Sequence, residues 1–302
     1  MAGRLKQTKK AAPKRPRRRI GWRIGVAALG LIALGAGALH LNARIVHVRY
    51  AEVALEDLPA SFDGTKILFA SDIDLCGLNT AADADRLFAR LQTLYPDILL
   101  LGGDYASPTL LERLNGRTGA DETAARKAFF DAIADFHAPM GKYAVSGDND
   151  GAHDALGLAM MGSGVQLIDG NLAAVSNGTD KIAIVGVGEG TDNVPQISAA
   201  IRSDQFAIAL MHRPSKLVDV RIAEAKDGGQ WADLSLAGHT HGGQLQIAGR
   251  TLLSLDEIEK RCPGGWYSEG GPFLVTQGVG CEAVNLRLGS QAEVWLITLK
   301  AK

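Results

Sequence analysis

The chain has 302 residues, of which 46% are hydrophobic and 22% are charged, so it is long enough for one large domain with a full core. The net charge of −1 hides an asymmetry. Residues 1–23 hold ten Lys and Arg and no acid, whereas the rest of the chain has 22 basic against 33 acidic residues. A nucleic-acid-binding domain would carry its basic charge on the folded part, so we expect no nucleic-acid partner.

A hydrophobic segment, IGVAALGLIALGAGALHL at 24–41, follows the basic residues. Its length is near the lower limit for a membrane-spanning helix, and it lacks the polar face of a core helix. Ten preceding positive charges predict a cytoplasmic N-terminus and a single-pass protein of the cell membrane, with its domain on the extracytoplasmic side. Cleavage after Ala43 is the alternative, although LNA is a poor signal-peptide site. We expect three parts: a basic cytoplasmic tail (1–23), a transmembrane signal-anchor (24–42) and a folded domain (43–302).

The chain has three cysteines, which cannot all pair with one another. Cys262 and Cys281 lie in a Gly-rich region, and an oxidising location would permit a disulfide between them. Two free thiols are an equally open alternative. We expect the protein to be a monomer.

Short apolar runs alternate with amphipathic helices along most of the domain. An edge strand is expected within 44–60, helices are expected at 80–95 and 121–137, and two C-terminal strands are expected in GPFLVTQG and AEVWLITLK. Further strands are expected at 66–70, 97–101, 142–145, 181–187, 206–211 and 234–238. This order predicts an α/β fold with two mixed β-sheets in a sandwich flanked by helices.

Five of these strands end in Asp or His, at the place where α/β sheets form their binding crevices. Asp after a strand is usually a turn or a helix cap, and a lone His is more often structural than a ligand. Five coincidences in a fixed order are a stronger signal, and the side chains suffice for two metal ions that share one carboxylate. The candidate ligands are Asp72, Asp74, Asp104, Asp148, His212, His239 and His241.

The order of these motifs resembles that of the calcineurin-like metallophosphoesterases, whose pattern is Asp-x-His, Gly-Asp, Gly-Asn-His-Asp/Glu, His, Gly-His-x-His. LPASFDGTKILFASDIDLCG, FHAPMGKYAVSGDND and LAGHTHGGQ look like the membrane-anchored bacterial branch of that family. The resemblance covers about residues 50–299, and GHTHGGQ is its most specific piece. It implies a four-layer fold and hydrolysis of phosphate esters at a two-metal site with a bridging hydroxide.

The resemblance also implies how the ligands divide between the two ions, with Asp104 shared. One ion would take Asp72, Asp74, Asp104 and His241. The other would take Asp104, Asp148, His212 and His239.

Three positions depart from the family pattern. Asp74 stands where the family has His, Asp148 stands where it has Asn, and Asn149 stands where it has the His that protonates the leaving group. Both changed ligand positions hold carboxylates, which still bind metal, so the changes favour a re-tuned site over a lost one. Oxygen-rich ligation favours Mn²⁺ or another hard divalent ion, with one Fe³⁺ as a further possibility that would restore positive charge.

The sequence therefore predicts a metallophosphoesterase that cleaves a phosphodiester or pyrophosphate bond, with Asp104 and Asn149 as its catalytic candidates. Asn149 cannot supply a proton at neutral pH, which predicts reduced or altered activity. The substrate is expected to be a phosphorylated small molecule or a lipid-linked phosphate. The alternatives are a non-catalytic metal- or phosphate-binding domain on the cell surface and a structural Ca²⁺-binding protein of the cell envelope.

Overall fold

The computed structural model describes residues 18–248, 250–251, 255–268 and 270–302. The chain divides into two compact units, residues 1–38 and residues 39–302. The predicted basic tail lies mostly outside the described residues.

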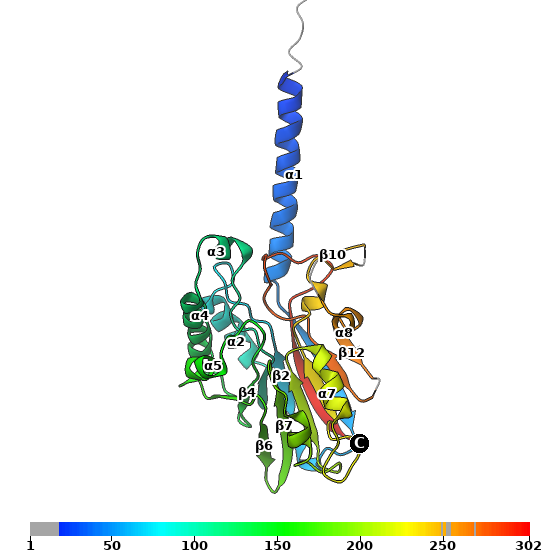
Figure 1. Ribbon diagram of the computed structural model, residues 1–302. Coiled ribbons are helices and arrows are strands. Elements are labelled where there is room, and N and C mark those ends of the chain that lie inside the picture. The colour runs from blue at the N-terminus through cyan, green and yellow to red at the C-terminus, as the bar shows by residue number, and fades with distance from the viewer. Residues whose placement is uncertain (1–17, 249, 252–254, 269) are drawn as a thin grey trace, which may run out of the picture. The chain divides into compact units, whose positions relative to one another are not determined.

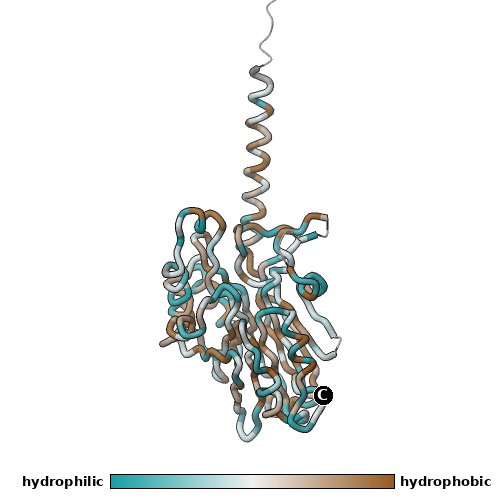
Figure 2. Tube along the Cα trace, viewed as in Figure 1, coloured by the Kyte–Doolittle hydropathy of each residue, from teal (hydrophilic) through white to brown (hydrophobic). Residues whose placement is uncertain are grey.

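The first described element is a single long helix, α1 (Arg18–Arg44). Its stretch Gly21–Arg44 has a mean hydropathy of 2.0, and its apolar window is not buried against any part of the protein that the structure describes. Figure 2 shows mainly apolar colouring along the helix. By length and composition, α1 can cross a membrane.

Two six-stranded mixed sheets form the body of the second unit (Figure 1). In the first sheet, β2, β3, β4 and β5 are parallel, whereas β14 runs antiparallel to β2 and parallel to β1. Its strands, in spatial order, are β1 (His47–Leu55), β14 (Glu293–Ala301), β2 (Lys66–Ala70), β3 (Ile98–Leu101), β4 (Lys142–Ala144) and β5 (Val165–Leu167).

The second sheet has a parallel centre of β7, β8, β9 and β13, with an antiparallel strand at each edge. Its strands, in spatial order, are β12 (Gly265–Tyr267), β13 (Phe273–Val275), β9 (Leu234–Ala237), β8 (Ala207–Met211), β7 (Asp180–Val187) and β6 (Leu172–Asn177). A separate small ribbon pairs β10 (Gln246–Ile247) with β11 (Arg250–Thr251).

Helices α2 (Ala81–Gln92), α4 (Gly119–Ala132) and α5 (His153–Met160) pack on the outer face of the first sheet, and α6 (Val194–Ser198) and α7 (Leu217–Ile222) pack on that of the second. The other described helical segments are α3 (Leu110–Leu114), α8 (Glu257–Arg261) and the 3-10 turns η1 (Ala60–Phe62), η2 (Pro214–Lys216) and η3 (His241–Gly243). α2 begins at Thr80, whose side chain and that of Asp83 form a reciprocal cap, so its start is encoded locally.

Alternation along the strands produces three apolar layers. In β2, Ile67 and Phe69 point into the core between the sheets, whereas Leu68 points to the outer side, where Phe88 of α2 and Phe129 of α4 pack. A third cluster joins the second sheet to its covering helices. The predicted fold, two mixed sheets in a sandwich flanked by helices, is therefore confirmed.

One sequence expectation needs correction. The helix expected at 121–137 begins at Gly119 and ends at Ala132, so Phe136 packs in the core from the turn that follows it. The helix ends there because the backbone angles of Ile133 are no longer helical. The spacing of apolar residues continues past this point and does not predict the end of the helix. Of the two alternatives left open for Cys262 and Cys281, the structure has no disulfide, since Cys281 carries a buried free thiol.

Candidate metal centre

The candidate ligands lie in the loops that directly follow five parallel strands. β2 leads to Asp72 and Asp74, β3 to Asp104, β4 to Asp148, β8 to His212, and β9 to His239 and His241. Because the carboxyl ends of parallel strands meet at one edge of a sheet, and the two sheets pack face to face, these loops converge. The structure thus brings together residues that are up to 169 positions apart in the chain.

Five of the seven candidate ligands have left-handed backbone conformations. Their φ angles are 53° at Asp72, 48° at Asp74, 56° at Asp104, 69° at His239 and 50° at His241. Such conformations cost about 1–3 kcal/mol each in non-glycine residues and persist where the surrounding structure enforces them. The strain is concentrated at the converging loops, which marks them as a functional site.

Gly238 permits the close approach of two of these loops. A Cβ atom there would lie 2.4 Å from an Asp72 carboxylate oxygen. Without it, the His239 backbone N–H donates to both Asp72 oxygens at 3.0 Å, which fixes the Asp72 carboxylate.

Asp104, Asp148, His212 and His239 form one candidate ligand group, in which one ligand atom from each residue lies within 4.8 Å of the others. His212 Nε2 lies 2.8 Å from Asp148 Oδ1 and 3.6 Å from Asp104 Oδ2. His239 Nδ1 lies 3.1 Å from Asp148 Oδ1. His212 Nδ1 contacts the Gly102 carbonyl at 2.8 Å, which leaves Nε2 facing the group. This is the set that the resemblance implied for the second ion.

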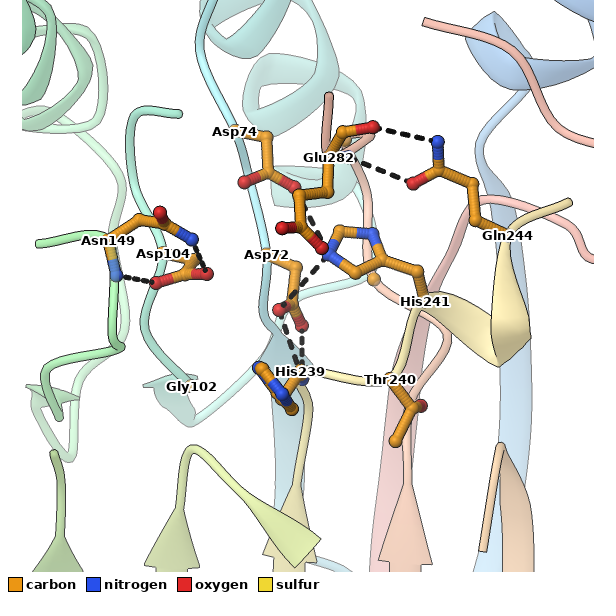
Figure 3. A network of polar contacts seen from close by, with 12 residues as sticks. Asp72, Asp74, Gly102, Asp104, Asn149, His239, Thr240, His241, Gln244 and Glu282 are labelled. Atoms are coloured by element: carbon orange, nitrogen blue, oxygen red, sulfur yellow. Dashed lines mark hydrogen bonds and ion pairs between the residues drawn. The ribbon is translucent and has the colours of Figure 1, made fainter. Parts of the chain in front are cut away.

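Asp72, Asp74 and His241 lie beside this group, as Figure 3 shows. His241 Nε2 lies 3.7 Å from Asp72 Oδ1 and 3.6 Å from Asp74 Oδ2. Asp74 is fully buried, and neither of its carboxylate oxygens has a hydrogen bond within the described part of the chain. An ionised carboxylate in that position needs a cation, because burial without a partner is costly.

The electrostatics point the same way. Burial, then the Asp104 carboxylate, raises the pKa of Asp74 well above its usual range, while burial raises the pKa of Asp72 to about 6. Burial lowers the pKa of His212, but Asp104 and Asp148 outweigh it, so the net pKa is raised. Protons on these carboxyl and imidazole groups thus reduce the net negative charge of the cluster. The donor set of carboxylates and imidazoles fits divalent transition ions of borderline to hard character.

Asn149 holds Asp104 in place. Its backbone N–H donates to Asp104 Oδ1 at 2.9 Å, and its side-chain Nδ2 donates to Oδ2 at 2.8 Å (Figure 3). The carboxamide of Asn149 is thereby engaged with the carboxylate that lies between the two ligand sets. Its observed role is to position Asp104.

The sequence did not single out Arg213, which lies next to His212 in the chain and reaches the second ligand group. Its Nη2 is 3.0 Å from Asp148 Oδ2, and its Nη1 is 2.9 Å from His239 Nε2. Two further acids, Glu189 and Glu259, contact the same guanidinium at 3.2 Å and 3.4 Å. Its adjacency to a candidate ligand was the only signal available in the sequence.

His239 is held between Asp148, Arg213 and Glu259. Burial lowers its pKa, but the bonds to Asp148 and Glu259 outweigh that effect and raise it to about 9. A guanidinium only donates hydrogen bonds, so the 2.9 Å contact with Arg213 requires an unprotonated Nε2. The geometry therefore corresponds to the neutral ring, which is the form that binds a metal.

Asp150 and Arg287 support the loops from beneath. Asp150 is fully buried and accepts backbone N–H groups of Asp104, Tyr105 and Gly147 at 2.8–2.9 Å. Arg287 is also fully buried and donates to backbone carbonyls, among them that of His241 at 3.3 Å. The Asp150 carboxylate accepts hydrogen bonds from backbone N–H groups, and the Arg287 guanidinium donates them to backbone carbonyls. Together they satisfy backbone groups of the strained loops that have no partner in a β-sheet.

Glu282 adds a further acid beside the site. Figure 3 shows its carboxylate directed toward His241 and Asp74. Its backbone is tied to Gln244 by reciprocal hydrogen bonds of 2.9 Å. Burial raises the pKa of its carboxyl group.

Comparison with known proteins agrees with this geometry, although no protein-family model matches the chain. An uncharacterised metallophosphoesterase of Bacillus subtilis (strain 168) is 24% identical, covering 92% of this chain and 94% of that protein. A phosphodiesterase of Escherichia coli (strain K12) is 26% identical, covering 83% of this chain and 87% of that protein. A transmembrane protein with a metallophosphoesterase domain from Danio rerio is 25% identical, covering 82% of this chain and 56% of that protein. The likeness extends over most of the chain, so this chain is similar to proteins named metallophosphoesterases.

Proposed function

We propose that the chain is a membrane-anchored, metal-dependent hydrolase of phosphate esters that cleaves phosphodiester or pyrophosphate bonds. The observation that carries this proposal is the convergence of two carboxylates and two imidazoles, those of Asp104, Asp148, His212 and His239. Beside them lies the buried Asp74, whose carboxylate oxygens have no hydrogen bond within the described part of the chain. The phosphodiesterase name of one relative supports the choice of reaction.

Two sets of residues would hold metal ions, with Asp104 shared. Asp104, Asp148, His212 and His239 would hold one ion, and Asp72, Asp74, Asp104 and His241 would hold the other. When bound, divalent ions supply Lewis-acid activation of the phosphate group and of water. The carboxylate-rich donor set favours Mn²⁺ or another hard divalent ion, or a pair that includes Fe³⁺.

The residues around the site restrict its substrates. Asn149 fixes Asp104 and cannot supply a proton at neutral pH, so a leaving group must depart without protonation or take its proton from solvent. Pyrophosphate-linked compounds and aryl phosphoesters meet this requirement, whereas alkyl phosphates do not.

The helix α1 would anchor the protein, and ten positive charges before it would hold the N-terminus in the cytoplasm. The hydrolase domain, acting as a monomer, would then face the outside of the membrane. Protease added to intact cells should digest residues 44–302. Full protection of the domain would contradict this topology.

Activity is tested with purified full-length protein in detergent. Metal content is first measured in protein prepared without added metal. Release of phosphate or nitrophenol is then measured on bis(nitrophenyl) phosphate, nitrophenyl phosphate and a nucleoside diphosphate ester, with Mn²⁺ and with chelator.

The decisive variant is Asp104→Asn, and Asp85→Asn on the exposed face of α2 is its matched control. Asp104→Asn should abolish turnover and most metal binding, whereas Asp85→Asn should change neither. Metal binding without turnover of any phosphate ester would favour a non-catalytic metal- or phosphate-binding domain. Tight binding of Ca²⁺ without hydrolysis would indicate a structural role.

A further inference from the structure

The direction of the strands places the candidate metal centre and the end of α1 at the same end of the folded unit. β1 begins at His47, three residues after α1 ends at Arg44. β14 runs parallel to β1 and antiparallel to β2, so the carboxyl end of β2, which leads to Asp72, lies at the end where β1 starts. We call this end, which holds Arg44 and Asp72, the site end. In Figure 1, α3 and β10 also lie there.

Contacts within the folded unit fix the last turn of α1 to the site end. His40 Nδ1 lies 3.0 Å from the Asn285 carbonyl, and Asn42 Nδ2 donates to the Arg287 carbonyl at 3.1 Å. Arg44 pairs with Asp83 of α2 at 2.7 Å. The apolar segment that could span a membrane ends at residue 41, so only a few residues of chain separate that segment from the site end.

The site end carries large apolar side chains that face solvent. α3 buries none of its residues, and its three leucines are 54%, 72% and 75% exposed. A helix in an aqueous protein normally turns such residues inward. Exposed apolar side chains of this end, within the described residues, include Leu78, Leu110, Leu111, Leu114, Ile247 and Leu288.

A cavity of about 200 Å³ beside the end of α1 is lined by positively charged side chains. Arg44, Arg86 and Arg90 line it, and Asp83 is the one acid among its lining residues in the described part of the chain. Arg44 and Arg86 share that carboxylate, each at 2.7 Å. Apolar and basic side chains together at the level of the headgroups are typical of a surface that lies in the membrane interface.

We propose that the site end docks on the bilayer that α1 spans, and that the metal centre takes a lipid carrying a phosphate or diphosphate headgroup directly from the leaflet. This inference rests on the proposed anchor and hydrolase function. For a lipid diphosphate, oxygen from water bonds to the terminal phosphorus, and the bond from that phosphorus to the bridging oxygen breaks. Inorganic phosphate and the lipid monophosphate are released, and the hydrogens of water pass to the products or to solvent.

Docking is tested without reference to activity. Full-length protein is reconstituted in vesicles of phosphatidylcholine and phosphatidylglycerol, and single nitroxide labels report access to oxygen and to a water-soluble nickel chelate. Cys76 and Cys281 are buried, so Cys262→Ser provides the background. The labelled variants are Leu111→Cys on α3, Thr179→Cys in the turn between β6 and β7, and Leu31→Cys in α1.

The three labels have different expected environments. The label at 31 should be in the bilayer, the label at 111 should show oxygen access above nickel access, and the label at 179, at the opposite end, should be in water. An aqueous environment for the labels at both 31 and 111 would overturn the anchor and the docking together. A bilayer environment for the label at 31 with an aqueous environment for the label at 111 would overturn the docking alone and leave the proposed hydrolase function intact.

A second measurement tests the substrate class. In the triple variant Leu110→Gln, Leu111→Gln, Leu114→Gln, phosphate release from diacylglycerol pyrophosphate in the same vesicles should fall by about tenfold or more. Hydrolysis of soluble bis(nitrophenyl) phosphate should stay within about twofold of the rate of the unsubstituted protein, since α3 contains none of the candidate metal ligands. The matched control is Ile222→Gln, 71% exposed at the end of α7. Equal losses on both substrates, or no turnover of the lipid beside good turnover of the soluble ester, would overturn the lipid assignment.

Discussion

Arg213 and Asp148 form an ion pair of 3.0 Å at the edge of the second ligand group. Asp148 is the position where the family pattern has a neutral Asn, so this chain has both an additional carboxylate and a guanidinium that compensates it. Arg213 takes Oδ2 of Asp148, while Oδ1 faces His212 and His239. The pair leaves one ligand oxygen directed toward the centre and limits the negative field that a phosphate substrate would meet.

Charge compensation predicts that the two residues are coupled. Arg213→Ala should lower kcat/KM by about tenfold or more, mainly through KM, because an uncompensated carboxylate repels the substrate. Asp148→Asn in the Arg213→Ala background should restore part of the loss. A double-mutant cycle on bis(nitrophenyl) phosphate measures the coupling, and strictly additive effects would show that Arg213 acts elsewhere.

Asn149 can be tested by restoring the imidazole of the family pattern. Asn149→His should raise turnover of alkyl phosphoesters by about tenfold or more, because the leaving alkoxide needs a proton, and aryl substrates should barely respond. Rates are compared across esters of graded leaving-group pKa. An equal change on both classes would mean that the position acts through its hydrogen bonds to Asp104 and not through proton donation.

Metal binding should release protons. Asp104 and Asp148 outweigh burial and raise the pKa of His212 well above its usual value, so this ring holds its proton more tightly than a free imidazole does. Ligation requires a neutral ring, so metal affinity should rise with pH through the raised pKa of His212 and then level off. Calorimetric titration of Mn²⁺ in buffers of different ionisation enthalpy counts the protons. No proton release at pH 7 would mean that His212 is already neutral in the metal-free protein, which contradicts this prediction.

Asp150 should matter for the fold of the site loops more than for charge. Asp150→Asn replaces one acceptor oxygen with a donor that faces backbone N–H groups, so we expect a loss of about 1–3 kcal/mol in the free energy of unfolding. Chemical denaturation measures this loss, with Asp154→Asn as the control, since that side chain is fully exposed. Equal stability of the two variants would mean that the loops do not depend on Asp150.

The sequence by itself determined most of the strands, their order along the chain and the residues that follow them, although it gave no sign of β5, β6 and β12. KILFA at 66–70 is β2 with the same bounds, and the Asp and His that follow each strand occur where local pattern predicted them. Such features are local, because strand periodicity and the turn after it depend on a few neighbouring residues. The apolar segment at 24–41 was also visible, since its length and composition need no tertiary partner.

Only the tertiary structure decided which side chains meet. Glu259 reaches Arg213 across 46 residues, and β14 inserts between β1 and β2 from the other end of the chain. The left-handed backbone at Asp72 and Asp104 is likewise invisible in sequence, because non-glycine residues adopt it only where surrounding contacts outweigh the local strain. Pairing between distant segments depends on the packing of the whole core, and no local pattern encodes that packing.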